Sequence, residues 1–443
     1  MHSQDLYCRI KGTIDTFEVI DSHEHIIIPE EEYLSSPADF ARFFVSYTID
    51  DIESAGAVFD RVEFRSTNGR VLKVNGRTLS LEEKWNFFKP YWNNVKFTGY
   101  GRAARLSIKR LLGINDLDDS SYREVSEKLD ALMKPGVYHT ILKDICGLKY
   151  ILNDVDFTDT PRQHQKIDRT LFHIVGRTRN FTLVFMKAEL ERLENLFNRN
   201  IRCLDDLLSI IDEQFELWIK DGCRAVKITD AYDRDLFYED STREEAERVM
   251  NRVFTLKKIF EFQEAMTFQE ARPLQNYIIH YFLRKAESLG FPVILHTGIQ
   301  AGIGNEVRNS QAVNLTNLFV KYPRIRFHLL HANYPYMQEA ACLAKQFVNV
   351  SLDLTWTNII VPAGAREGLS HFLDMVPVNK IHGFGGDYRM PESVWGALEV
   401  ARENIALVLT EKVEQGTMTE KEALEIARRI LSDNIQEIIR FGE

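Results

Sequence analysis

Two histidines separated by one residue stand in the segment Asp21-Ser22-His23-Glu24-His25. They follow the stretch Phe17–Ile20, which is typical of a buried strand. Because side chains at positions i and i+2 of a strand point to the same face, His23 and His25 can present two imidazoles to one point. This arrangement suits a divalent metal ion, whereas surface or structural histidines are the alternative for such a pair taken alone.

Three later apolar runs also end in a side chain that can bind a metal. His296 closes Val293–Leu295, His331 closes Phe327–Leu330, and Asp387 follows two glycines near the end of the chain. Each residue alone has an ordinary structural interpretation, such as a turn or helix-capping role for Asp387. Five such residues at the ends of four predicted strands favour a joint function.

Four imidazoles and one carboxylate suit zinc or another borderline divalent ion such as manganese. Three or four of the groups would bind one ion and leave a position open for water. The ion would lower the pKa of that water, and Asp387 could take the water's proton if it lies within hydrogen-bond reach.

Three further residues are candidates for substrate binding. Lys227 ends the run Ala225–Lys227 and could be ion-paired, contact an anionic substrate or carry a carbamate between two metals. Arg389, two residues after Asp387, could bind a substrate carboxylate with two hydrogen bonds, although an ordinary surface cation is the alternative. Trp356 is a candidate for the wall of the site.

The elements that must position these residues alternate between apolar strands and amphipathic helices with short connections, a pattern typical of parallel sheets. The eight predicted strands are Phe17–Asp21, Leu148–Val155, Phe181–Lys187, Arg224–Thr229, Pro292–His296, Arg324–His331, Val348–Leu354 and Lys380–Asp387. Eight strands favour a distorted (β/α)₈ TIM barrel over an open sheet. Such barrels place catalytic groups at the C-terminal ends of their strands.

Residues 28–147 interrupt this alternation with helical patterns at 81–91 and 122–133. We expect one barrel domain over residues 1–443, with 28–147 as a helical insertion after the first strand that covers the barrel mouth. A separate N-terminal subdomain is the alternative. The aromatic residues between Trp85 and Trp92 are expected to pack the core of the insertion itself.

Composition limits the partners and the location of this 443-residue chain. A formal net charge of −10 leaves no excess of cations to meet phosphates, which argues against general binding of nucleic acid or anionic membranes. The five cysteines show no C-x-x-C spacing, no secretory signal is recognisable, and no apolar run approaches the ~20 residues of a membrane span. We therefore expect a cytoplasmic protein that acts on a small molecule, and a homo-oligomer is compatible with the sequence.

The motifs, taken in order, resemble the amidohydrolase superfamily. Asp21-x-His23-x-His25, the strand-end His296 and His331, and Asp387 followed by Pro391-Glu392 are similar to its amidohydrolase-related (amidohydrolase 2) branch. They look like the amidohydrolase-type domain fused to glutamine synthetase-like domains in some fungal and plant proteins. Because this chain ends soon after the predicted barrel, we expect no synthetase domain.

The resemblance implies a metal-dependent hydrolase of the TIM-barrel type with His23, His25, His296 and Asp387 as ligands of a single ion. It implies that His331 polarises substrate or water, or binds a second metal, and that Asp387 also accepts a proton. The expected reaction is hydrolysis of a C–N or C–O bond in a small carboxylate-bearing substrate. A metal-dependent decarboxylase and a sugar-acid isomerase like uronate isomerase are the alternatives within the superfamily.

Overall fold

The computed structural model describes residues 2–35, 38–45, 47–59, 73–74, 77–155, 167–259 and 262–439. Its central element is an eight-stranded parallel sheet in the order β1-β4-β5-β6-β9-β10-β11-β12. The strands are β1 (Val19–Glu24), β4 (Leu148–Val155), β5 (Phe172–Arg177), β6 (Val226–Ile228), β9 (Val293–Leu295), β10 (Phe327–Leu329), β11 (Val350–Asp353) and β12 (Ile381–His382).

The sheet closes because the segment after β12 returns to β1. The Ser22 N–H donates to the Phe384 carbonyl at 3.2 Å, and the Asp387 N–H donates to the His23 carbonyl at 2.8 Å. The His25 N–H donates to the Tyr388 carbonyl at 2.9 Å. The predicted distorted (β/α)₈ barrel is therefore confirmed, and its first and last strands meet beside the candidate ligands.

The third strand lies outside the segment predicted for it. Residues 181–187 were expected to form that strand, but β5 occupies Phe172–Arg177 and the predicted segment holds α9 (Arg179–Thr182) and the start of α10 (Lys187–Phe197). Phe181 and Val184 are buried in the outer core between sheet and helices. A run of apolar residues alone does not distinguish this kind of burial from a strand.

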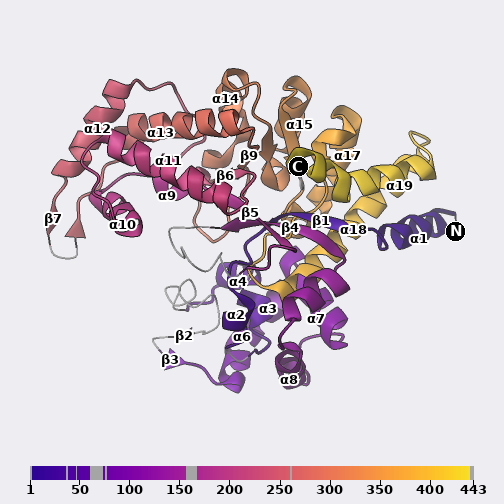
Figure 1. Cartoon of the computed structure of the whole chain (residues 1–443). Coiled ribbons are helices and arrows are strands. Elements are labelled where there is room, and N and C mark those ends of the chain that lie inside the picture. The colour runs from indigo at the N-terminus through magenta and orange to yellow at the C-terminus, as the bar shows by residue number, and fades with distance from the viewer. Residues whose placement is uncertain are drawn as a thin grey trace.

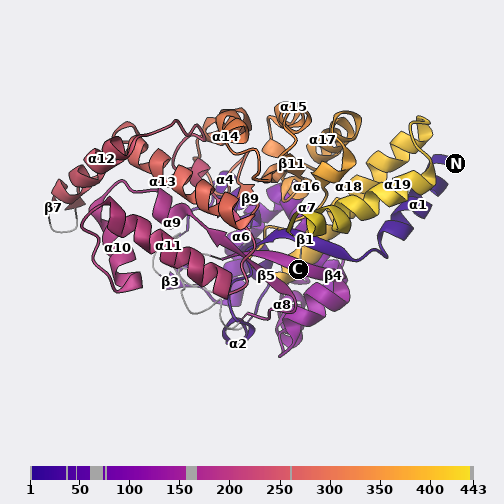
Figure 2. The same ribbon diagram turned by 45° about the horizontal axis from the view of Figure 1, so that its top comes forward.

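Helices surround the barrel, and the two views in Figures 1 and 2 show them on its outer side. The longer ones outside the 28–147 segment are α1 (His2–Ile14), α10, α11 (Leu204–Lys220), α12 (Arg243–Thr255), α13 (Phe268–Leu289), α15 (Met337–Gln346), α17 (Pro362–Met375), α18 (Pro391–Glu414) and α19 (Glu420–Arg428). Shorter helices are α14 (Thr316–Lys321), α16 (Thr357–Ile360) and α20 (Asn434–Ile439). The helix α12 ends at Thr255, and the short antiparallel pair β7 (Lys258–Ile259) and β8 (Phe262–Gln263) follows it.

Local capping explains several helix starts. Thr267 precedes α13, its hydroxyl accepts the Glu270 N–H at 3.3 Å, and its own N–H donates to the Glu270 carboxylate at 2.8 Å. The same reciprocal arrangement precedes α12 and α19. Each such cap satisfies two backbone donors that the helix itself leaves unpaired.

The 28–147 segment contributes helices that gather on one side of the molecule in Figure 1. They are α2 (Glu30–Tyr33), α3 (Arg42–Val45), α4 (Thr48–Ser54), α6 (Leu81–Val95), α7 (Gly99–Leu112) and α8 (Tyr122–Leu132), together with the short pair β2 (Lys73–Val74) and β3 (Arg77–Thr78). Trp85, Phe88 and Trp92 lie in a hydrophobic cluster made of this segment's own residues, as expected.

The interior of the barrel is unequally divided. Leu152, Val175, Ala225 and Ile294, from β4, β5, β6 and β9, belong to a separate apolar cluster that also includes the α20 isoleucines. The inward positions of the neighbouring strands β10, β11 and β12 hold His328, Asp353 and His382, all buried. The core is therefore apolar on one side and polar on the other.

The polar side is joined by hydrogen bonds. His328 Nε2 lies 2.7 Å from Asp353 Oδ2 and its Nδ1 lies 2.9 Å from the Ser351 hydroxyl. The Thr355 N–H and hydroxyl both donate to Asp353 Oδ1, at 2.6 and 2.8 Å. The ring of His382 lies 4.5 Å from that of His328, and neither of its nitrogens has a hydrogen-bond partner among the described residues. Of the helices that the structure describes, none is long and apolar enough to cross a membrane.

Candidate active site

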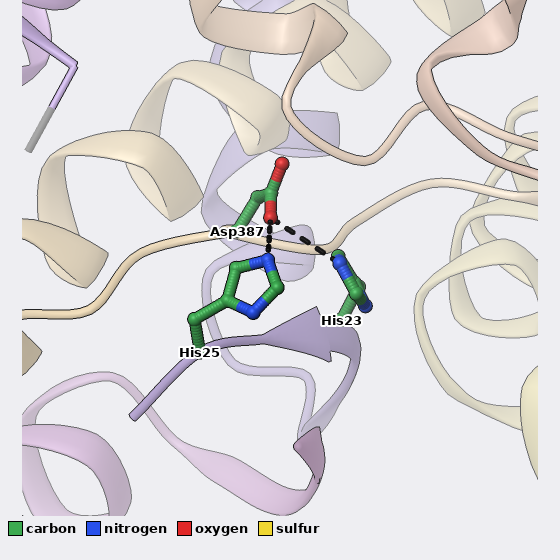
Figure 3. A group of neighbouring side chains, drawn as sticks. All are labelled: His23, His25 and Asp387. Carbon is green, nitrogen blue, oxygen red and sulfur yellow. Dashed lines mark ion pairs between the residues drawn. The ribbon is translucent and has the colours of Figure 1, made fainter. Parts of the chain in front are cut away.

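Three predicted ligands converge at the C-terminal end of the barrel. His25 Nε2 lies 2.9 Å from Asp387 Oδ1, and His23 Nε2 lies 3.3 Å from the same oxygen. One ligand atom from each of these residues lies within 4.8 Å of the other two. Figure 3 shows both imidazoles directed at the carboxylate, which comes from the opposite end of the chain.

The donor set fits a divalent cation. Asp387 Oδ1 is buried and has no hydrogen bond of good geometry with any described residue, although two imidazole nitrogens face it. A buried carboxylate oxygen without a hydrogen bond is costly. Burial alone would raise the pKa of Asp387, but attraction to His23 and His25 holds it well below its usual range. An ionised carboxylate between two neutral imidazoles is the form that binds zinc or a similar ion.

A buried carboxyl pair fixes the last strand against the first. Asp21 Oδ1 accepts the His23 N–H at 3.0 Å and the Gly386 N–H at 3.3 Å, and the Glu24 carboxylate accepts the Tyr388 N–H. Burial raises the pKa of Asp21 to about 7 and takes the pKa of Glu24 well above its usual range, which favours a shared proton between them. A side chain on Gly386 would overlap the Glu24 carboxylate, so only glycine allows this approach.

The backbone of Asp387 itself is held in the left-handed region, with φ of 63°. Its N–H donates to the His23 carbonyl at 2.8 Å, and its own carbonyl accepts a hydrogen bond from the Tyr47 hydroxyl. A non-glycine residue persists in this conformation when its surroundings fix it. The 28–147 segment thus contacts the residue that supplies the carboxylate ligand.

His296 and His331 form a pair next to this centre. His331 Nε2 lies 3.0 Å from His296 Nδ1 and 4.0 Å from Asp387 Oδ2, while His331 Nδ1 faces the Thr355 carbonyl at 3.2 Å. Because that carbonyl accepts a hydrogen bond, Nδ1 carries a proton and Nε2 of the neutral ring presents its lone pair. Burial lowers the pKa of His331 to about 4, and that of His296 lies well below its usual range.

The backbone explains why these two rings meet. β10 ends at Leu329, and His331, Ala332 and Asn333 all have positive φ, at 61°, 47° and 55°. The chain therefore leaves the strand pattern before His331, and both His328 and His331 lie on the barrel side. A regular strand would turn His328, three residues earlier, to the opposite face, whereas here it pairs with Asp353 inside the barrel.

Lys227 lies beside the candidate ligands, fully buried in the middle of β6. Its Nζ is 3.3 Å from His23 Nε2. Burial lowers the pKa of Lys227 to about 8, although Asp154 and Asp387 attract its charge. It faces the side of the His23 ring that would bind the ion, so it is placed to contact an anionic group there.

Arg177 and Asp154 belong to the same site, and the sequence analysis did not find them. Arg177 donates to Asp154 Oδ2 at 2.7 Å and its Nη2 lies 3.2 Å from His25 Nδ1, while Asp154 Oδ2 is 3.9 Å from that nitrogen. Because a guanidinium only donates, His25 Nδ1 is the acceptor of the Arg177 N–H, and in the neutral ring the proton lies on Nε2, which faces Asp387 Oδ1. Arg177 is the last residue of β5, and its position at the mouth was missed because this strand was predicted about ten residues too late.

Arg389 reaches solvent, yet protein groups surround it. The side chain is exposed, and desolvation is the first cause that lowers its pKa, followed by repulsion from Arg177. Tyr47, Asp387 and Tyr232 are the other groups whose charges it feels.

Aromatic rings complete the wall. Trp356 is buried, and its ring centroid lies 5.2 Å from that of His331 and 4.7 Å from that of Tyr47. The Trp356 Nε1–H has no acceptor among the described residues. Tyr232 lies 4.9 Å from the His296 ring.

A family model described as amidohydrolase matches residues 212–441, which is more than half of the chain. The chain belongs to the amidohydrolase family. The family expected from the motifs is confirmed. Protein fluG of Emericella nidulans is 30% identical over 180 residues, a stretch that covers 39% of this chain and 21% of that protein. The match thus spans about a fifth of the relative's length.

Solved structures share the fold over the whole length. A uronate isomerase from Thermotoga maritima has a TM-score of 0.78 at 16% identity, covering 98% of this chain and 97% of its own. A glucuronate isomerase from Caulobacter crescentus reaches 0.77 at 14% identity, with 100% and 95% covered. A Lactobacillus casei protein proposed to be a metal-dependent hydrolase reaches 0.65 at 14% identity, with 97% of each chain covered. This amidohydrolase therefore shares its fold with two isomerases of sugar acids and with the Lactobacillus casei protein.

Proposed function

We propose that this amidohydrolase is a metal-dependent hydrolase that cleaves a C–N or C–O bond in a small, carboxylate-bearing substrate. The position of Asp387 carries the proposal. One oxygen, Oδ1, faces His23 and His25, and the other, Oδ2, lies 4.0 Å from His331 Nε2. A single carboxylate therefore links the proposed metal ligands to a neutral imidazole that can accept and return a proton.

His23, His25 and Asp387 would hold one divalent ion, with zinc the first candidate and manganese the second. We keep His296 as a proposed fourth ligand, although its Nδ1 is directed at His331. When bound, the ion supplies polarisation of the scissile carbonyl and acidifies water.

The residues of the chain then move the protons. Asp387 Oδ2 accepts a proton from the attacking water, and His331 Nε2 receives it, since its Nδ1–H is held by the Thr355 carbonyl. His331 returns that proton to the departing nitrogen or oxygen as its bond to carbon breaks. One water is consumed, and neither residue changes its protonation state over the cycle.

Three residues would position the substrate. Arg389 makes no hydrogen bond or ion pair within the described part of the chain, so its charge is available for a substrate carboxylate. Lys227 would approach the oxygen that develops charge near His23. Trp356, with its unpaired indole N–H, would form one wall.

The 28–147 segment would cover the mouth as part of one domain with the barrel. Tyr47 donates to the Asp387 carbonyl, and Asp50 Oδ2 accepts the Gly302 N–H at 2.8 Å from the loop after β9. These contacts support a cover that limits the entry of water and of large substrates. A cytoplasmic location remains a proposal from composition.

Isomerisation of a sugar acid is the second candidate. The observation that favours it is the fold likeness to two uronate isomerases over nearly the whole chain, including the 28–147 segment. In that case Asp387 and His331 would transfer a proton between neighbouring carbons, with no water consumed. Decarboxylation would instead release CO₂.

Product mass separates these reactions. The metal-loaded protein would be incubated with dipeptides, N-acyl amino acids, lactones and uronates, and the products would be weighed by mass spectrometry. Hydrolysis adds one water, isomerisation leaves the mass unchanged and decarboxylation removes CO₂.

Variants then test the assigned residues. Asp387→Asn and His331→Asn should each lower turnover by at least ~100-fold, while His371→Asn on the outer helix α17 controls for the chemical change. Full turnover by metal-loaded Asp387→Asn would contradict the mechanism.

A further inference from the structure

One partner of His331 determines which of its ring nitrogens carries the proton. Its Nε2 lies 3.0 Å from His296 Nδ1, and this contact suits either tautomer, because either ring can be the donor. Its Nδ1 lies 3.2 Å from the Thr355 carbonyl, which can only accept. The tautomer of His331 therefore depends on the orientation of the peptide group that joins Thr355 to Trp356.

That peptide group belongs to a strained turn. The Thr357 N–H donates to the Thr355 carbonyl at 2.6 Å, and Trp356 between them has φ of 62° and ψ of −35°. A hydrogen bond between residues i and i+2 around a residue of positive φ forms a γ-turn of the rare, strained kind. A non-glycine residue keeps such a conformation only where its surroundings fix it.

A reversal of this peptide group would change the chemistry of His331. At present its N–H, that of Trp356, donates to the Gly385 carbonyl at 2.9 Å. If the group turned over, this N–H would face His331 Nδ1, and the proton of the neutral ring would lie on Nε2. Nε2 could then accept no proton beside Asp387 Oδ2, which lies 4.0 Å away.

Asp353 holds the residue that precedes this peptide group. Its Oδ1 accepts the Thr355 N–H at 2.6 Å and the Thr355 hydroxyl at 2.8 Å. The Ser22 hydroxyl, from β1, lies 2.8 Å from the Thr355 hydroxyl, and a side chain on Gly385 would overlap both oxygens. Because Asp353 and Thr355 are fully buried, these bonds are not exchanged for bonds to water.

His328 holds the other oxygen of Asp353. The Ser351 hydroxyl donates to the Phe327 carbonyl at 3.3 Å, so its oxygen accepts the His328 Nδ1–H at 2.9 Å. His328 Nε2, 2.7 Å from Asp353 Oδ2, donates to the carboxylate, and the ring then carries both protons. The charge of Asp353 is thus balanced inside the barrel, and its Oδ1 remains an ionised acceptor for Thr355.

We propose that the buried pair of Asp353 and His328 fixes His331, through the γ-turn at Trp356, in the tautomer with a protonated Nδ1 and an accepting Nε2. Asp353 is then a positioning residue that acts on His331 through Thr355. This inference rests on the proposed function in one respect, the role of His331 as a proton carrier.

NMR reads the tautomer directly. The full-length protein, labelled with nitrogen-15 in its histidines, would be examined at pH 7 by long-range proton–nitrogen correlation, which distinguishes the two neutral forms of the ring. Metal is left out, because an ion on Nε2 would itself place the proton on Nδ1. Comparison with His331→Asn assigns the signals. The wild type should show His331 with its proton on Nδ1.

Two variants weaken the hold on the turn. Asp353→Asn replaces a charged acceptor by a neutral one and should lower the fraction of His331 in the Nδ1–H form at least about twofold, with the Nε2–H form appearing in its place. Thr355→Val removes only the hydroxyl donor and should act in the same direction. It takes the place of Asp353→Asn as the deciding variant if the latter does not fold.

Two further variants serve as controls. Thr355→Ser keeps both donors to Asp353 and should retain the wild-type tautomer of His331. His382→Gln changes another histidine buried inside the barrel, one whose ring nitrogens have no hydrogen-bond partner among the described residues, and it should leave the tautomer unchanged. A merely structural role of Asp353 would lower stability without moving the proton of His331.

The proposal would be overturned by a wild-type His331 with its proton on Nε2. An unchanged tautomer in the deciding variant would overturn it equally. The test is separate from that of the reaction. If the tautomer depends on Asp353 and no product gains water, hydrolysis is wrong and the positioning role stands. If hydrolysis occurs and the variants keep the wild-type tautomer, the positioning role is wrong and the reaction stands.

Discussion

The barrel interior has an apolar half and a polar half, which contribute differently to the stability of the barrel and to the support of the candidate site. The side of β4, β5, β6 and β9 is filled by residues such as Val175 and Ile294, whose packing gives stability. The side of β10, β11 and β12 is filled by His328, Asp353 and His382, buried at the same depth. Above the polar side lie His331 and Asp387, the proposed proton carriers.

The difference teaches where rigidity comes from beneath a catalytic centre. Apolar packing tolerates small shifts, whereas the bonds of Asp353 to His328 and Thr355 have fixed lengths and directions. Thr355 also positions His331 through its carbonyl. The polar half thus connects the barrel interior to the site, and the apolar half stabilises the barrel without that connection.

The largest expected effect is in the polar half. Asp353→Asn should lower the free energy of unfolding at pH 7 by about 4 kcal/mol, because it leaves the buried His328 without its charged partner. Burial alone would raise the pKa of Asp353, but His328 lowers it below its usual range. A carboxyl group whose pKa is lower in the folded than in the unfolded protein stabilises the fold at pH values above its unfolded pKa of about 4. This stabilisation is lost as the pH falls.

The difference in stability between wild type and Asp353→Asn, measured by urea unfolding, should therefore be full at pH 7 and shrink below pH ~4. A difference that stays constant from pH 7 to pH 3 would contradict the ion pair.

The next effect is in the apolar half. Ile294→Ala should lower the free energy of unfolding by about 3 kcal/mol, since it opens a cavity among fully buried side chains. Zinc affinity, measured by competition with a chelator, should stay within a factor of about two. A large loss of zinc affinity in this variant would show that both halves support the site, and the proposed difference between the apolar and polar halves would be wrong.

The third effect tests the ligand set. Asp387→Asn should weaken zinc binding by about 100-fold, roughly 2.7 kcal/mol, because a neutral amide replaces the only ionised ligand. Calorimetry on metal-free protein checks it. His328→Gln is the control from the polar half, since His328 contacts none of the proposed ligands in the described structure, and its zinc affinity should change far less.

The smallest effect concerns the residue beside His25. Asp154→Asn should weaken zinc binding by about tenfold, because the Arg177 cation, which lies 3.2 Å from His25 Nδ1, would lose the carboxylate that neutralises it and would repel the ion. The same calorimetric titration measures it. Zinc affinity equal to that of the wild type would mean that the ion pair of Arg177 and Asp154 does not affect zinc binding through His25.

The sequence predicts the fold well where strands are bounded by clear turns. The strand Leu148–Val155 has the expected bounds, and His23, His25 and Asp387 converge as the alternation of strand side chains and the barrel geometry require. The family is confirmed. Whether His296 binds the metal, and which residues meet substrate, stay predictions.

The misses have physical causes. Phe181–Lys187 is more apolar than β5, yet its side chains pack between sheet and helices, and only tertiary contacts distinguish the two. A regular strand would put His328 and His331 on opposite faces, and a strand period does not reveal the three consecutive left-handed residues that bring both to the barrel side. The pairing of Arg177 with Asp154 joins β5 to β4, so it could not be found while β5 was predicted in the wrong segment.

The carboxyl pair of Asp21 and Glu24 has a consequence for how the protein matures. It holds the segment after the last strand against the first, and the proposed ligands come from these same two segments. A chain still emerging from the ribosome cannot assemble the centre until the segment that carries Asp387 has been made. Metal uptake would therefore report that the two segments have joined, and a chain truncated before Asp387 would be recognisable by its inability to retain zinc.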